Sequence, residues 1–181
     1  RMTNKRNRRI DQYMHTVSHR IIELLVKEGI GMLVIGKNDG WKQEVNMGRR
    51  NNQNFVQIPH ARFVSMLTYK AELVGITVKV TEESYTSKAS LLDLDPLPVW
   101  KPNDETKHAF SGKRVERGLY QASNGRYINA DTNGAGNTIR KVAPDAFGSE
   151  GVEDGKALLA SLVVHPVRLV IAPSRTQKGK S

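Results

Sequence analysis

Hydrophobic residues recur at helical spacing in the first part of the chain. Between residues 6 and 27 apolar side chains stand three or four positions apart, and polar ones such as Gln12 and Glu23 fall between them. This periodicity predicts a long amphipathic helix. The continuous apolar run Met32-Leu33-Val34-Ile35 comes next, a pattern typical of a strand that is buried on both faces. The first predicted elements are therefore a helix and a buried strand.

A second helix and a second strand follow a long polar loop, which covers residues 36–54. The helix is predicted to open at Pro59 and to end at Gly75. Its apolar stripe consists of Phe63, Met66, Leu67, Leu73 and Val74, with Lys70 among them. Residues 76–80 alternate as a strand does. Helix, strand, helix, strand in this order predicts an α/β layer whose two strands are parallel and joined by a crossover helix.

A hairpin and a third helix are predicted further on. Asn124-Gly125 is a strong turn signal between two short runs, residues 117–120 and 126–128. Asp131 stands where a helix cap would, and residues 134–136 are small enough for another backbone to approach. A carboxylate at this junction of strand and helix suits a divalent metal, although simple capping is the alternative interpretation.

The charge of the chain indicates nucleic acid as its partner. Lys and Arg number 28 against 18 Asp and Glu, which gives a formal net charge of +10. These cations gather at segment edges, near residues 5–9, 49–50 and 113–117 and in the last residues. The alternative is that the excess charge only aids solubility. No apolar run is long enough for a membrane span, so a soluble cytoplasmic protein without a membrane partner is expected.

Four spaced motifs resemble the C-terminal half of OrfB/TnpB proteins over about residues 6–144. The motifs are Val34-Ile35-Gly36-Lys37-Asn38 with Trp41-Lys42-Gln43, then Tyr69-Lys70-Ala71-Glu72, then Glu83-Ser84-Tyr85-Thr86-Ser87-Lys88, and finally Asn129-Ala130-Asp131-Thr132-Asn133 with Asn137. Proteins of this family are transposon-encoded, RNA-guided DNA nucleases related to the type V CRISPR effectors, and older annotation calls them transposases. The resemblance implies DNA and a guide RNA as partners.

The resemblance also implies a RuvC-like nuclease core with an RNase H type fold. Three carboxylates of such a core bind two divalent metals, Mg²⁺ or Mn²⁺, which activate water and stabilise the leaving oxygen. The third carboxylate matches Asp131. The second would follow the strand that ends at Ile35, but Gly36 stands there. We expect Glu83 to supply it, with Glu82 next and Asp39 a weaker candidate; that both glutamates are solvated strand-end charges is the alternative.

Two further departures from the family shape the expected architecture. The strand with the first carboxylate would precede the N-terminal helix, so the chain is expected to be a C-terminal fragment without nuclease activity of its own. Residues 1–147 would form an incomplete RuvC-like core, and residues 148–181 a partly disordered extension. The insertion at about 86–127 corresponds to a four-cysteine zinc ribbon, but the chain has no Cys. A degenerate ribbon without zinc is therefore expected.

Several residues are candidates for contact with nucleic acid. The polar loop offers Trp41, Lys42, Arg49 and Arg50, an aromatic plane among cations that could hold a base and its backbone; core packing of Trp41 is equally open. The other candidates are Thr86, Ser87, Lys88, Arg114 and Asn133, of which residues 86–88 could instead form a plain turn.

Three histidines have a different interpretation. His15 and His19 are four positions apart on the first helix, but no third ligand is evident, and His108 stands alone. They are interpreted as polar surface positions.

Overall fold

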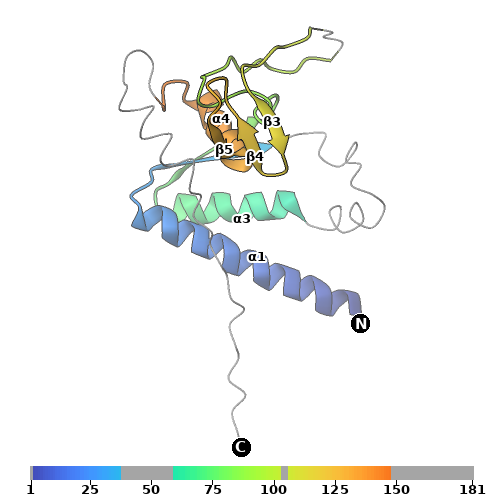
Figure 1. Ribbon diagram of the computed structural model, residues 1–181. Coiled ribbons are helices and arrows are strands. Elements are labelled where there is room, and N and C mark those ends of the chain that lie inside the picture. Colours follow the sequence, from blue (N-terminus) through green and yellow to red (C-terminus); the bar gives the residue numbers. More distant parts are fainter. Residues whose placement is uncertain (1, 38–58, 103–105, 148–181) are drawn as a thin grey trace, which may run out of the picture.

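The computed structural model describes residues 2–37, 59–102 and 106–147 (Figure 1). Two long helices, α1 (Met2–Lys27) and α3 (His60–Leu73), alternate with the strands β1 (Met32–Lys37) and β2 (Thr77–Glu82). A second part contains β3 (Lys113–Glu116), β4 (Leu119–Gln121), β5 (Tyr127–Asn129) and the helix α4 (Ala130–Val142). The predicted extension and most of the predicted polar loop lie outside the described residues.

The two long strands pair in parallel, as their order along the chain predicted. Met32 is the partner of Thr77, and the register continues to Lys37 and Glu82. Helices α1 and α3 pack on one side of this pair, where Ile35 joins a core built around Leu67. The hairpin strands and α4 lie on the other side, and α4 contacts both β1 and β2 (Figure 1).

Both long helices end in the same way. Gly29 and Gly75 have φ values of +67° and +78°, a left-handed conformation that glycine adopts without a steric penalty. In each case the amide one residue later donates back to the carbonyl five positions before it, Ile30 to Leu25 and Ile76 to Ala71. This is the Schellman arrangement, which turns the chain sharply into the strand that follows.

The predicted stripe of α3 is correct in its centre and wrong at its end. Met66, Leu67 and Ala71 are buried. Leu73 is 80% exposed, because it stands two positions after Ala71 and therefore on nearly the opposite side of the helix. Lys70 has a polar role: its ammonium donates to the His15 carbonyl and the Ser18 hydroxyl, both at 2.8 Å, which ties α3 to α1.

The hairpin has one more strand than predicted. β4 and β5 pair on either side of the predicted turn, where Gly125 has a φ of +79°. β3 pairs with β4 at the edge, and its four residues are all exposed, so no apolar alternation marked it. Tyr120 is fully buried beside Leu91 and Ile128, whereas Tyr127 on β5 is 52% exposed.

The described part of the chain has one small parallel sheet and no candidate for a membrane-spanning helix. Its parallel sheet contains two strands, so a complete RNase H type sheet remains an expectation drawn from the resemblance. None of its helices is both long and apolar enough to cross a membrane.

Candidate functional site

Glu83 fills the space beside Gly36. Gly36 lies near the end of β1 and Glu83 directly follows β2, which pairs with β1. A Cβ atom added to Gly36 would fall well inside 3.0 Å of Cγ, Cδ and Oε1 of Glu83. The side chain at 83 therefore occupies the volume that any side chain at position 36 would need.

The position of Gly36 in β1 shows on which face of the sheet the Glu83 side chain lies. Side chains of a strand alternate between its two faces, and Ile35 packs into the core with α1 and α3. Gly36 therefore lies on the opposite face, the side on which α4 contacts the strands.

The Glu83 carboxylate lies in an unfavourable electrostatic environment. Burial raises the pKa of Glu83, and the negative charge of Glu82 raises it further. Within the described ranges this carboxylate has no hydrogen-bond partner, so nothing there offsets its desolvation. A carboxylate in this situation is stabilised by a cation or a proton.

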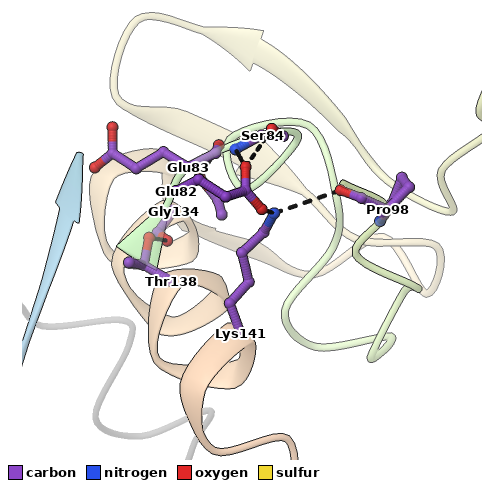
Figure 2. Close-up of polar contacts among 8 residues, drawn as sticks. Glu82, Glu83, Ser84, Pro98, Gly134, Thr138 and Lys141 are labelled. Carbon is purple, nitrogen blue, oxygen red and sulfur yellow. Dashed lines mark hydrogen bonds and ion pairs between the residues drawn. The ribbon is translucent and has the colours of Figure 1, made fainter. Parts of the chain in front are cut away.

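Glu82 has the opposite surroundings, as Figure 2 shows. Its carboxylate forms an ion pair with Lys141 of α4, whose side chain is only 6% exposed, and accepts hydrogen bonds from the amide and hydroxyl of Ser84. Burial alone would raise the pKa of Glu82, but the hydrogen bonds from Lys141 and Ser84 outweigh it and lower the pKa. Glu82 is thus already compensated, and Glu83 is the carboxylate left for another cation.

Asp131 does not cap α4. The cap is Asn129, whose backbone is extended and whose Oδ1 accepts from the Asp131 amide at 2.9 Å and the Thr132 amide at 3.0 Å. Asp131 is already in the first turn, where its exposed carboxylate interacts favourably with the helix dipole. The prediction of a cap was displaced by two residues, and the correction leaves the carboxylate of Asp131 available for a ligand.

The spacing along α4 relates Asp131 to the two glutamates. Asp131, Gly134, Thr138 and Lys141 are three or four positions apart, so they share one face of the helix. Figure 2 shows Gly134, Thr138 and Lys141 beside Glu82 and Glu83. Asp131 belongs to the same face, one turn before Gly134.

The described residues do not form a complete metal site. No group of three acidic or histidine side chains in these ranges is close enough to hold a metal ion. Asp39 lies outside the described residues, as do Trp41, Lys42, Arg49 and Arg50.

The loop that follows Glu83 contains both exposed and internally bonded candidates. Ser87, Lys88 and, on β3, Arg114 are exposed. Thr86 is buried, and its hydroxyl donates to the Glu83 carbonyl at 3.0 Å. This contact matches the plain turn that was the alternative for Thr86.

Asn133 corrects the sequence interpretation. Its side chain has no exposed surface, accepts from the Leu91 amide at 2.9 Å and donates to the Ala89 carbonyl at 2.8 Å. Asn137, one turn later, donates to the carbonyls of Thr86 and Ala89. These two amides fasten the loop to α4, so in this structure Asn133 positions the loop and does not face a ligand.

Carboxylate and serine side chains join the segments where the resemblance places the zinc ribbon. Asp93 accepts from the Ser123 amide at 3.0 Å and the Ser123 hydroxyl at 2.5 Å. Asp95, which is buried, accepts from the Ser90 amide and from the amide and hydroxyl of Ser111.

The pKa values near this network follow from burial and hydrogen bonding. Burial would raise the pKa of Asp93, but hydrogen bonds from Ser123 and Ser90 lower it. Burial, with the charges of Asp95 and Asp93, raises the pKa of Tyr120 to about 12. The Asp93 carboxylate is thus stabilised as an anion by its partners, and Tyr120 remains neutral.

One family comparison bears on this region. Residues 60–138 match the Cas12f1-like TNB domain. The matched stretch contains Glu82, Glu83 and Asp131, although it covers less than half of the chain. It supports a relationship to TnpB- and Cas12-related proteins for this part. A comparison with curated proteins finds no match.

Proposed function

We propose that this chain carries part of the RuvC-like active site of a transposon-encoded, RNA-guided DNA endonuclease of the OrfB/TnpB type. In this proposal Glu83 and Asp131 are two of the three carboxylate ligands of Mg²⁺ or Mn²⁺. The observation that carries it is the Glu83 side chain in the space beside Gly36. The family's second carboxylate follows the strand that corresponds to β1. A carboxylate at the end of β2 would occupy the same place in the site.

The electrostatics of Glu83 favour a ligand over a solvated strand-end charge. A solvated carboxylate keeps its ordinary pKa, but burial and the charge of Glu82 raise the pKa of Glu83. A divalent cation would remove this penalty and lower that pKa. Glu82, the other candidate, would have to give up Lys141 before binding metal.

The side chains of this site would hold and orient the metals. When bound, the metals activate water and stabilise the oxygen that leaves the phosphodiester. Lys141 keeps Glu82 away from the site, and the Asn133 and Asn137 amides fix the loop behind Glu83. The exposed Ser87 and Lys88 are available to hold a phosphate.

The experiment compares cleavage of single-stranded DNA by this chain and by a version extended upstream with the family's first carboxylate, each with guide RNA and Mg²⁺ or Mn²⁺. We expect activity in the extended protein, reduced at least a hundredfold or so by Glu83→Gln, because a metal supplies several kcal/mol of charge stabilisation. Glu72→Gln, on the exposed side of α3, is the matched control. Full activity of the Glu83→Gln protein would exclude the assigned role.

The second candidate is a nuclease-inactive, nucleic-acid-binding remnant of the same family. It is favoured by one observation, that no three acidic or histidine side chains of the described residues come together. DNA binding without cleavage, by both the chain and its extended version, would select this function.

A further inference from the structure

Three aromatic side chains meet where the loop after Glu83 approaches residues 108–110. The Tyr85 ring lies edge-on to the His108 ring, with centroids 4.9 Å apart, and tilted toward the Phe110 ring at 6.0 Å. We refer to these three residues as the aromatic cluster. Tyr85 comes two residues after Glu83 in the chain, so the cluster adjoins the loop that carries the proposed ligand.

A cavity opens next to the aromatic cluster. It has a volume of about 360 Å³ and lies between residues 96–98 and residues 107–110. Two prolines, Pro96 and Pro98, line it together with His108 and Phe110. Small-molecule sites begin at about this volume, and flat apolar walls of this kind suit a planar ring.

Cations border both the cluster and the cavity. The Lys88 ammonium lies 5.8 Å from the centre of the Tyr85 ring, within the range of a cation–π contact. Lys107 lines the cavity itself, and both lysines are exposed. Aromatic planes flanked by cations form the combination that binds single-stranded nucleic acid, because bases stack on the rings and phosphates pair with the charges.

The backbone at Tyr85 is strained. Its φ is +60°, a left-handed conformation that is rare for a bulky residue. The amides of Lys88 and Ala89 both donate to the Tyr85 carbonyl at 2.9 Å and hold it there. Strain of this kind collects at ligand clamps.

We propose that the cavity takes one unpaired nucleobase, stacked on the aromatic cluster, with its phosphates at Lys88 and Lys107. This deepens the proposed function and rests on it, because the cluster takes Tyr85 from the loop that follows Glu83. The occupant is chosen by charge complementarity: Lys107 lines the cavity and Lys88 lies over the Tyr85 ring, and nucleic acid combines a planar ring with an anionic backbone.

The test measures binding of labelled oligonucleotides of about twelve residues to the full chain by fluorescence anisotropy. Oligothymidylate is compared with an abasic strand of the same length, which keeps the phosphates and lacks the bases. We expect thymidylate to bind roughly five-fold or more tightly, the lower range for one stacked base. His108→Ala/Phe110→Ala removes this preference and leaves the abasic strand's affinity unchanged. Tyr127→Ala, an exposed aromatic on β5, retains the preference.

The outcomes separate this inference from the proposed function. Equal affinity for both strands would overturn the nucleobase site and leave the nuclease proposal standing. Retention of the preference in the double variant would also overturn it. If oligouridylate binds more tightly than oligothymidylate, the bound base belongs to RNA. If oligothymidylate binds more tightly, it belongs to DNA.

A second measurement needs no variant and so does not depend on folding. Thymidylate that contains 5-iododeoxyuridine is cross-linked to the chain by light, and the attachment site is found by mass spectrometry. We expect attachment at Tyr85, His108 or Phe110. Attachment exclusively at residues outside the cluster and the cavity would overturn the inference.

Discussion

Replacement of Asn133 by Ala should destabilise the fold and leave nucleic-acid binding by the folded protein unchanged. The side chain has no exposed surface and pairs with the Leu91 amide and the Ala89 carbonyl. The carbonyl keeps a second donor, Asn137, at 2.8 Å. The Leu91 amide loses its partner, so a buried N–H group is left without a hydrogen bond.

An unsatisfied buried donor costs about 1–3 kcal/mol. Because the loss at Ala89 is small, we expect a decrease of about 2 kcal/mol in the free energy of unfolding. For a chain of this size the melting temperature falls by roughly 4–8 °C. Thermal unfolding followed by circular dichroism measures this shift.

The control is Asn4→Ala, an exposed position on α1 where the same change should be nearly neutral. DNA affinity is then measured well below the melting temperature of each variant. An unchanged melting temperature together with weaker DNA binding at Asn133→Ala would refute this reasoning and restore Asn133 as a nucleic-acid contact.

Three further predictions concern charged groups. Because the folded state raises the pKa of Glu83, its charge destabilises the fold as the pH rises through that pKa. With a chelator present, the melting temperature of Glu83→Gln should therefore exceed that of the wild type at pH 7, but not at pH 3. Mg²⁺ should raise the melting temperature of the wild type only. The fold lowers the pKa of Asp93, so the stabilising effect of its charge is present at neutral pH and is lost as the pH falls through that lowered pKa. The melting temperature of Asp93→Asn should therefore be lower than that of the wild type at pH 7. A zinc chelator should not change the wild-type melting temperature. Lys141→Met should leave Glu82 without its cation and raise the Glu82 pKa toward that of Glu83, which NMR titration of the side-chain carboxyls would detect; an unchanged Glu82 pKa would contradict the assigned pairing.

Local patterns predicted the backbone elements well. The amphipathic periodicity of α1, the apolar run of β1 and the glycines after both long helices each depend on near neighbours in the sequence. The parallel pairing followed from the order of the elements. The position of the α4 cap was wrong because Asn129 and Asp131 are both good capping residues, and only the extended backbone at Asn129 decides between them.

The side-chain pairings of the site could not be predicted in this way. Glu82 and Lys141 are 59 positions apart, and Asp93 and Ser123 are 30 apart. Their contacts depend on how α4 and the hairpin pack against the loop after β2. Asn133 illustrates the limit: a polar residue in a motif with Asp131 suggested a ligand contact, but tertiary packing buried it against the backbone.

The resemblance suggested two carboxylates as ligands, and packing gives the adjacent glutamates different surroundings. The sequence prediction ranked Glu83 ahead of Glu82, although the two neighbours have the same chemistry. Lys141 compensates one of them, and Gly36 makes room for the other. A glycine at a strand end is ambiguous in sequence, because the side chain that needs its space comes from another strand.

The most direct measurement exchanges the two positions. In the extended protein, Gly36→Glu/Glu83→Gly returns the carboxylate to β1, and DNA cleavage with Mg²⁺ is compared with the two single variants. If Glu83 occupies the place of a ligand on β1, both single variants lose activity, Glu83→Gly for lack of a carboxylate and Gly36→Glu by collision, and the double variant recovers part of it. A double variant no more active than Glu83→Gly, with the fold intact, would contradict the central claim.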